Sequence, residues 1–372
     1  MRELTIVSEL LLVLYVATVL VNCCYYLYFL KFGFARDVLN KNVSSSKEGV
    51  SIVICAKNEA QNIEALLQSL LSQDYPLFEI LLVNDNSTDA TPALIYHFAN
   101  LHDAIKVIDL NPKTGKKAGI TQAIANSSYK KLLFTDADCL PNSPHWITSM
   151  TQKLNGPKEI VLGYSGYKHY KNSWLNKLIR FETLVTAMQY FSYATYNNTY
   201  MGVGRNLSYL KKTFKAANGF KKHLHLKAGD DDLFVNQTAT TTNVTMCFNA
   251  ESFTYSEPKR TWKEWFVQKR RHTDVARKYK LKHQIQLGLF YLSQFLFFGL
   301  LTVLLVQQQF ILLVCVLALI RIFLVWFVTS KTAIKLEERK LIPVIPILEP
   351  FLISLQLLIF ISNTLVKPRR WN

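Results

Sequence analysis

The sequence predicts an α/β domain, with a mostly parallel sheet flanked by helices, set between transmembrane helices at the N-terminal and C-terminal ends. Three features predict this architecture. From residue 50 onward, short apolar runs of strand length alternate with segments whose apolar residues recur at helical spacing. Polar clusters follow several of these runs, at the strand ends where such sheets bind ligands. Half of the 372 residues are hydrophobic, and the longest apolar runs lie at the two ends.

The first long apolar run predicts a membrane anchor over residues 1–31. It extends from Leu10 to Leu30 and is interrupted only by Thr18 and Asn22. A helix of about 20 apolar residues crosses a hydrocarbon core of about 30 Å. A cleaved signal peptide is the alternative, but the run is too long for one and no small-residue cleavage site follows it. We expect a polar linker over residues 32–49.

Basic residues predict the orientation of this anchor. Arg2 precedes the apolar run, whereas a group of four basic residues follows it: Lys31, Arg36, Lys41 and Lys47. Positively charged flanks stay on the cytoplasmic side of a membrane. We therefore expect an integral protein of the plasma or inner membrane whose domain from residue 50 is cytoplasmic.

The formal net charge of +17 would also suit a nucleic-acid-binding protein. The basic residues instead cluster beside the apolar segments and between Lys259 and Lys282, where lipid headgroups and phosphorylated substrates supply negative charge. The sequence contains no zinc-finger spacing and no RNA-recognition signature, so we expect no nucleic-acid partner. The six cysteines form no Cys-x-x-Cys pair and are expected to be reduced thiols.

The domain from residue 50 is expected to begin with alternating strands and helices. Helical spacing predicts helices over residues 59–71 and 92–98 and, after the loop Asn111–Lys117, up to about Asn126. Apolar runs predict strands at Val50–Ala56, Phe78–Val83, Ile105–Leu110 and Leu132–Phe134.

Two carboxylates, Asp136 and Asp138, follow the last of these strands. Hard divalent cations such as Mg²⁺ bind carboxylate oxygens and fill their remaining positions with water and phosphate. The pair therefore indicates a site for a metal-bound diphosphate. An acidic turn or a helix cap is the alternative interpretation.

A set of motifs resembles, in order and spacing, those of glycosyltransferase family 2, which has the GT-A fold. Four of them belong to the nucleotide-binding half of that family: ICAKNE, LLVNDNSTDAT, GKKAGITQAIA and FTDADC. GDDDLFVN, from Gly229, resembles the family's acidic motif, and QKRRH, from Gln268, resembles its Gln-x-x-Arg-Trp motif. The resemblance implies a GT-A catalytic domain over residues 50–258 that transfers a sugar, with inversion, from a nucleoside diphosphate sugar.

The resemblance also implies donor-binding residues. Asn58 and Glu59 would lie near the nucleoside, although Glu59 also suits a cap of its own helix. Asp85 suits a contact with a pyrimidine N–H, which would select UDP. Lys117 matches the family lysine that approaches the diphosphate, whereas Lys116 is expected to be solvated.

The resemblance also implies which residues bind the metal ion and which residue acts as the catalytic base. Asp138 is expected to bind Mg²⁺ or Mn²⁺ directly, with Asp136 nearer the ribose or a metal-bound water, and the cation would stabilise the leaving diphosphate. The base that takes the proton of the acceptor hydroxyl is expected to be Asp230 or Asp231. Counting back from Leu233 favours Asp230, and alignment on the preceding glycine favours Asp231. Capping of a helix N-terminus is the alternative role for the remaining acids.

Three other segments lie outside these motifs. Arg205 and Asn206 follow a glycine and are hypotheses for contacts with the acceptor or the donor sugar. Trp174–Phe191 predicts a core helix, with a lipid-facing helix as the alternative. The pair Asn218-Gly219 predicts a helix C-cap.

Residues 259–285 predict an amphipathic helix that lies in the membrane interface, because tryptophans alternate there with basic residues at helical spacing. In the family motif, Gln268 and Arg271 help to close the site over the diphosphate and the acceptor. His272 stands where the family has tryptophan. If that tryptophan is a platform for a sugar acceptor, its replacement predicts the addition of one sugar instead of a long polymer.

The C-terminal region, residues 286–372, predicts two to three membrane spans. Gln286–Val306 and Gln309–Val328 are long apolar runs, and a charged cytoplasmic loop is expected over Lys331–Lys340. The third run, Leu341–Val366, contains three prolines and a glutamate. It is either a kinked span or a re-entrant element.

Together these features predict a membrane-anchored inverting glycosyltransferase that uses a UDP-sugar and a lipid or lipid-linked acceptor at the cytoplasmic face. A processive polysaccharide synthase is the alternative within this class, and such an enzyme usually needs more spans to form a channel. A non-catalytic membrane scaffold with a nucleotide-binding fold is the alternative from another class. The intact acidic motifs argue against it.

Overall fold

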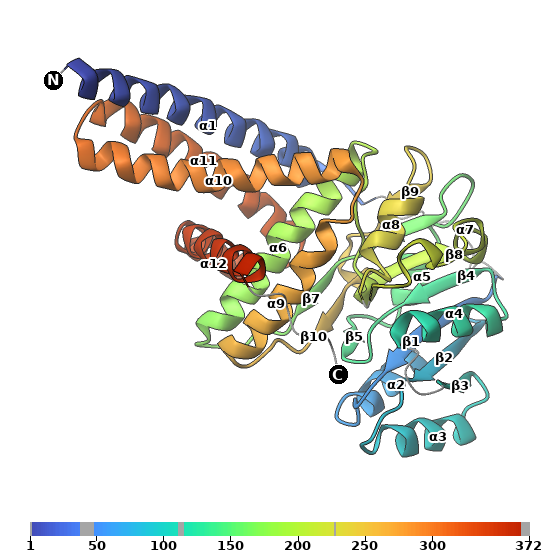
Figure 1. The fold of residues 1–372 in the computed structure, drawn as a ribbon. Helices are drawn as coiled ribbons and strands as arrows, with labels where there is room; N and C mark the ends of the chain where they lie inside the picture. Colours follow the sequence, from blue (N-terminus) through green and yellow to red (C-terminus); the bar gives the residue numbers. More distant parts are fainter. Residues whose placement is uncertain (1, 38–47, 111–114, 227, 366–372) are drawn as a thin grey trace. The chain divides into compact units, whose positions relative to one another are not determined.

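The computed structural model describes residues 2–37, 48–110, 115–226 and 228–365 (Figure 1). These residues form two compact units. The sheet unit comprises the described residues of 36–172 and 193–259, and the helical unit comprises those of 2–35, 173–192 and 260–365. Residues 38–47 of the expected linker and residues 111–114 of the expected lysine loop lie outside the described residues.

The sheet unit contains a large mixed sheet with the strand order β3-β2-β1-β4-β8-β6-β9 (Figure 1). Its first four strands are parallel: β3 (Ile105–Asp109), β2 (Phe78–Asn84), β1 (Val50–Ala56) and β4 (Lys131–Phe134). β8 is antiparallel to both β4 and β6, and β9 is parallel to β6; these strands are β8 (Leu207–Leu210), β6 (Ile160–Leu162) and β9 (Val244–Met246). The four predicted strands and their parallel pairing are confirmed.

A second, smaller sheet has the order β5-β10-β7. Its strands are β5 (Cys139–Pro141), β10 (Thr254–Ser256) and β7 (Ser165–Tyr167). β10 pairs in antiparallel fashion with β5 and in parallel with β7. This sheet therefore begins directly after the turn that carries the paired acids.

Burial explains the sequence of the N-terminal strands. β1 and β2 read as continuous apolar runs because both faces of a parallel sheet are covered. Ile52, Ile80 and Leu66 are fully buried members of their common core. The helices of this half are α2 (Ile63–Leu71), α3 (Thr91–Leu101), α4 (Lys116–Asn126) and α5 (Trp146–Thr151).

The register brings the polar strand ends to one edge of the sheet. Ala56 at the end of β1 pairs with Asn84 at the end of β2, and Val53 in β1 pairs with Phe134 in β4. After β8, the chain contains further short helices: α7 (Lys211–Ala216), η2 (Lys221–His223), α8 (Asp232–Thr238) and η3 (Ala250–Ser252). The predicted C-cap follows α7, where Asn218 and Gly219 have φ values of 55° and 58°.

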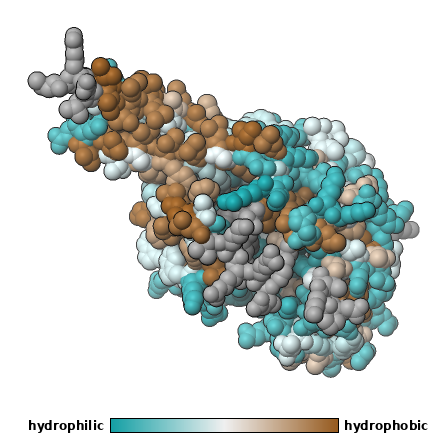
Figure 2. All heavy atoms as spheres, viewed as in Figure 1, coloured by the Kyte–Doolittle hydropathy of each residue, from teal (hydrophilic) through white to brown (hydrophobic). Residues whose placement is uncertain are grey.

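The helical unit contains four helical segments long and apolar enough to cross a membrane, within the part of the chain that the structure describes. They are Ile6–Phe34, Leu281–Gln307, Ile311–Lys335 and Arg339–Leu365. They correspond to α1 (Arg2–Phe34), α10 (Leu281–Gln307), α11 (Ile311–Lys335) and, together, η4 (Arg339–Val344) and α12 (Ile345–Leu365). Figure 2 shows hydrophobic residues gathered along α1, α10 and α11 on the face in view.

The structure bears on three expectations for these helices. Lys331 and Lys335 belong to α11, so the charged loop predicted over Lys331–Lys340 is shorter than expected. The third C-terminal run is a helical segment long enough to cross a membrane, which favours a span over a re-entrant element. α6 (Trp174–Thr195) has the buried side chains expected of a core helix, but most of it belongs to the helical unit.

Candidate active site

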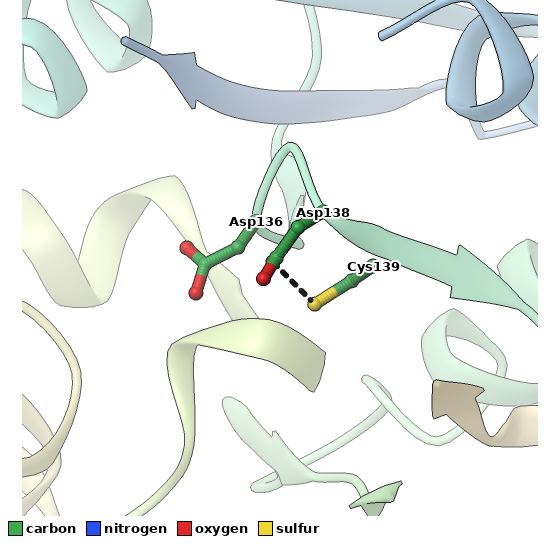
Figure 3. A group of neighbouring side chains, drawn as sticks. All are labelled: Asp136, Asp138 and Cys139. Carbon is green, nitrogen blue, oxygen red and sulfur yellow. Dashed lines mark hydrogen bonds between the residues drawn. The ribbon is translucent and has the colours of Figure 1, made fainter. Parts of the chain in front are cut away.

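Asp136, Asp138 and Cys139 come together just after β4 (Figure 3). The two aspartates lie on the turn between β4 and β5, and Cys139 is the first residue of β5. Their ligand atoms all lie within 4.8 Å of one another. The Cys139 N–H donates to the Asp136 carbonyl oxygen at 3.1 Å and so closes the turn. The predicted acid pair therefore forms one cluster at the carboxyl edge of the sheet.

The electrostatics of this cluster fit a divalent cation. Burial raises the pKa of Asp138, and the charge of Asp136 raises it further. A cation between the carboxylates would relieve this repulsion, and carboxylate oxygens are ligands that Mg²⁺ and Mn²⁺ prefer. Burial also raises the pKa of Cys139 well above its usual value. Its thiol donates to Asp138 Oδ1 at 3.3 Å, so Cys139 is a neutral hydrogen-bond donor in this structure.

Arg205 adds positive charge close to this cluster. Its guanidinium donates to the Ser165 carbonyl oxygen and to the Ser256 hydroxyl, in each case at 3.2 Å, and lies 4.5 Å from the centre of the Tyr167 ring. Its charge opposes the larger effects of burial and of Asp136 on the Asp138 pKa. These contacts tie η1 (Gly204–Asn206) to the small sheet behind the acids.

Asn206, the second hypothesis from that segment, has a structural environment. Its amide nitrogen donates to the carbonyl oxygens of Tyr164 and Ser252, in each case at 2.7 Å. Its amide oxygen accepts from Trp146 Nε1 at 3.0 Å. The side chain is fully buried in these contacts, which gives Asn206 a role in joining β8 to the loops around it.

Lys116 joins the paired acids to the second acidic motif. Its Nζ lies 2.8 Å from Asp136 Oδ1 and 3.0 Å from Asp230 Oδ2. Burial alone would lower the pKa of Lys116, but Asp136, Asp230 and Asp231 together raise it well above its usual value. A small cavity is lined by these four residues and by the end of β4. The sequence predicted a solvated Lys116, and this contact was not expected.

The two candidates for the base, Asp230 and Asp231, have different surroundings. Asp231 is the N-cap of α8 and accepts hydrogen bonds from the backbone N–H groups of Gly204 and Asp232, each at 2.7 Å. Burial raises the pKa of Asp231, and the charge of Asp230 raises it further. Asp230 instead directs a carboxylate oxygen at Lys116. Its environment fits a reacting group, and that of Asp231 fits the helix-cap alternative.

The residues expected near the nucleoside connect the ends of β1 and β2. Asn58 has a φ of 56°, and its side-chain oxygen accepts from the Thr88 N–H at 2.8 Å. The Asp85 N–H donates to the Ala56 carbonyl oxygen at 2.9 Å. Glu59 accepts from the Asn62 amide at 2.7 Å, and burial raises its pKa. The structure thus places all three predicted residues at the carboxyl edge, and their contacts with a donor stay a prediction.

Lys117 lies next to Lys116 but has different partners. Its Nζ donates to the carbonyl oxygens of His223 and Leu226, at 2.7 Å and 3.0 Å. The residue is 4 % exposed. These contacts hold the segment before Gly229 in place, and the predicted role of Lys117 at the diphosphate is not tested by them.

Gln268 belongs to α9 (Trp262–Ala276) in the helical unit. α9 begins at the expected aromatic segment, and the Thr261 hydroxyl caps it by accepting from the Glu264 N–H at 3.2 Å. The side chains of Arg271 and His272 lie outside the described part of the chain. Their roles, and that of Gln268, stay predictions.

Comparison with known proteins identifies the segment that carries Asp136 and Asp138. Residues 51–216 match the model of the family described as Glycosyl transferase family 2. This segment is a glycosyl transferase family 2 domain. It includes the strands that deliver Asp136 and Asp138 and the helix that begins at Lys116, so the resemblance of the four motifs within it is confirmed.

Named relatives of the family match about a third of the chain. A stretch of 119 residues is 34% identical to the poly-beta-1,6-N-acetyl-D-glucosamine synthase of Staphylococcus epidermidis and covers 32% of this chain and 29% of that protein. A stretch of 123 residues is 30% identical to glycosyltransferase AglE of Haloferax volcanii and covers 32% of this chain and 40% of that protein. The similarity thus spans less than half the length of these relatives.

A solved structure extends the similarity of the fold beyond this segment. The mannosyltransferase PcManGT of Pyrobaculum calidifontis, in complex with GDP-Man and Mn²⁺, has a TM-score of 0.58. It covers 88% of this chain and 97% of the solved chain at 17% identity. The GT-A-like α/β fold predicted from the sequence is therefore confirmed.

Proposed function

We propose that this chain is an inverting glycosyltransferase that moves a sugar from a UDP-sugar to a lipid or lipid-linked acceptor at the cytoplasmic face of the membrane. The observation that carries this proposal is the contact of Lys116 with both Asp136 and Asp230. Asp136 in turn clusters with Asp138. Asp136 and Asp138, which are suited to bind a metal-bound diphosphate, thus lie near Asp230, which is suited to accept the proton of the acceptor. The four apolar helices support a membrane-bound acceptor.

The chain's residues divide the reaction between them. Asp138 and Asp136 would hold Mg²⁺ or Mn²⁺, which when bound stabilises negative charge on the leaving diphosphate. Asp230 takes the proton from the acceptor hydroxyl while the hydroxyl oxygen forms a bond to the anomeric carbon. The bond from that carbon to the diphosphate oxygen breaks on the opposite face, so the configuration inverts. Asp85, at the end of β2, accepts a hydrogen bond from the uracil N–H and so selects uracil as the nucleobase of the donor.

A donor screen tests this proposal. Membranes from cells that express the chain would be incubated with UDP- and GDP-sugars, and release of the nucleoside diphosphate would be measured with Mn²⁺ and with a chelator. The S. epidermidis relative is named as a synthase of an N-acetylglucosamine polymer, so UDP-N-acetylglucosamine is the first donor to test. We expect metal-dependent UDP release that an Asp138→Asn variant lacks. Release from none of the donors would favour the non-catalytic scaffold.

A processive polysaccharide synthase is the second candidate. The similarity to a poly-beta-1,6-N-acetyl-D-glucosamine synthase favours it. The replacement of the family's tryptophan by His272 favours the transfer of one sugar. Analysis of product length made by the purified protein separates the two, because long polymer would contradict single transfer.

A further inference from the structure

Lys116 occupies the point at which the two acidic motifs meet. Its Nζ lies 2.8 Å from Asp136 Oδ1 and 3.0 Å from Asp230 Oδ2. Asp136 belongs to the cluster that would hold a cation, and Asp230 is the proposed base. One ammonium group therefore neutralises a candidate metal ligand and the base at the same time.

Lys116 lies at a helix end that repels its positive charge, and its contacts with Asp136 and Asp230 compensate for this repulsion. α4 begins at Lys116, directly after Gly115, whose φ is 74°. A positive side chain in the first turn of a helix is repelled by the partial positive charge of the helix N-terminus. Contacts with carboxylates offset this repulsion, so a change in their charge would release the side chain.

The exposure of the two neighbouring lysines differs. The side chain of Lys116 is 38 % exposed and that of Asp136 is 32 % exposed. Lys117 is buried, and its departure would leave the carbonyl oxygens of His223 and Leu226 without the donor they now have. A lysine ammonium on a flexible stem changes partners without movement of its helix when water reaches it. Of the two lysines, Lys116 is therefore the one whose ammonium group can change its ion-pair partners.

We propose that Lys116 is an exchangeable counter-ion that couples donor binding to release of the base. The proposal rests on the proposed function. When Asp136 pairs with the divalent cation that accompanies a donor, its ion pair with Lys116 is lost, and the diphosphate oxygens offer the ammonium a new anionic partner. Asp230 is then free to accept the proton of the acceptor hydroxyl. Before donor binding, Asp230 stays paired and does not activate water.

The coupling predicts opposite effects on metal and nucleotide. The full-length protein in detergent would be titrated with Mn²⁺ alone, and bound Mn²⁺ would be measured by electron paramagnetic resonance. Lys116→Gln removes the competing cation, so we expect Mn²⁺ affinity without nucleotide to rise about threefold or more. UDP affinity in the presence of Mn²⁺ is expected to fall by a similar factor, because the diphosphate loses its second partner. Lys116→Arg retains the charge and should change both affinities less.

Lys212→Gln is the matched control. Lys212 lies in the first turn of α7 and pairs with Glu159 at 2.6 Å, with 64 % of its side chain exposed. The Lys212→Gln variant therefore also removes a lysine from an ion pair in the sheet unit. Its affinities for Mn²⁺ and for UDP should equal those of the unmodified protein.

Each outcome decides between the two proposals. Unchanged or weaker Mn²⁺ binding by Lys116→Gln, in a protein whose unmodified form binds Mn²⁺ and UDP, would overturn the coupling and leave the proposed function in place. Failure of the unmodified protein to bind either ligand would instead remove the proposed function. Loss of the fold in both Lys116→Gln and Lys116→Met would show that Lys116 is a structural ion-pair partner, which also overturns the coupling.

Discussion

Arg321 on α11 and Glu349 on α12 form a buried ion pair inside the apolar part of the helical unit. Arg321 Nη2 lies 2.6 Å from Glu349 Oε1, and the side chains are 0 % and 7 % exposed. The same nitrogen donates to Asn22 Oδ1 on α1 at 3.0 Å and to Gln294 Oε1 on α10 at 2.5 Å. Each of the four candidate membrane segments thus contributes one polar side chain to a cluster around Arg321. Charged side chains within membrane-spanning helices are tolerated when they are paired in this way.

Glu349→Gln should destabilise the helical unit strongly. It leaves the Arg321 charge buried without its carboxylate, which costs about 3–5 kcal/mol when one partner of a buried pair is removed. Thermal unfolding in detergent measures the loss. Arg321→Met combined with Glu349→Gln should recover part of the stability, and Glu264→Gln on the exposed start of α9 is the control. Equal melting of Glu349→Gln and the unmodified protein would show that the pair contributes little.

Asp138→Asn and Asp230→Asn should fail in different ways. Asp138→Asn removes a candidate metal ligand, so metal-dependent UDP affinity and turnover should both fall, because diphosphate charge is then uncompensated in the ground and transition states. Asp230→Asn leaves that site intact. We expect donor affinity to change little and turnover to fall by about 10² or more. UDP affinity with and without Mn²⁺, measured beside turnover, separates the two roles.

Asp231→Asn completes this comparison. Asp231 caps α8 and accepts from the Gly204 N–H. Asparagine keeps one acceptor oxygen, so Asp231→Asn should change stability little, whereas Asp231→Ala should lower it by about 0.5–2 kcal/mol. If Asp231→Asn abolishes turnover while Asp230→Asn does not, the base lies one residue along the chain. If neither variant loses turnover, the acidic motif is a helix cap and not a catalytic group.

Lys117→Met tests whether Lys117 is structural. The carbonyl oxygens of His223 and Leu226 would lose their donor, which costs roughly 1–3 kcal/mol for buried groups. We expect a lower melting temperature and nearly unchanged UDP affinity. A large loss of UDP affinity at unchanged stability would support instead the diphosphate contact predicted from the family motif.

His223 predicts a pH dependence of stability. Burial, together with the smaller effect of the nearby Lys117 charge, lowers its pKa from 6.5 to about 4. Because the unfolded chain binds this proton at the higher pKa, the stabilising contribution is complete above about pH 6.5 and is lost progressively as the pH falls toward 4. Between about pH 7 and about pH 5, His223→Gln should therefore lose less stability than the unmodified protein. His225→Gln, at an exposed neighbour, is the control. Parallel pH profiles for His223→Gln and the unmodified protein would contradict this assignment.

Membrane orientation can be checked with reporter fusions. The basic flank of the first span predicts that a reporter fused at Asn42 lies in the cytoplasm. α10 and α11 cross in opposite directions in this arrangement, so a reporter at Lys335 should also read as cytoplasmic. An external signal at Asn42 would separate the sheet unit from cytoplasmic nucleotide sugars and would contradict the proposed donor.

The sequence determined the sheet and the position of its acids. Val50–Ala56 and Leu132–Phe134 are apolar runs of strand length, and alternation with helices makes such strands parallel. Parallel strands present their carboxyl ends at one edge, which was enough to predict that Asp85 and Asp136 share it. The strands β6 and β8 were missed because three or four residues are too short to show a period, and no acid pair follows them as it follows β4.

Only the tertiary structure decided which side chains meet. Lys116 and Lys117 are consecutive in the sequence, but successive helical residues point about 100° apart, and the packing of α4 against the sheet determines which of them reaches Asp136. Arg321 likewise lies in a run that the sequence shows simply as apolar, and Glu349 lies beside prolines that suggested a break. Their pairing depends on the rotation and register of α11 and α12 against each other. Those quantities come from the packing of many side chains across helices, and no local pattern along the chain records them.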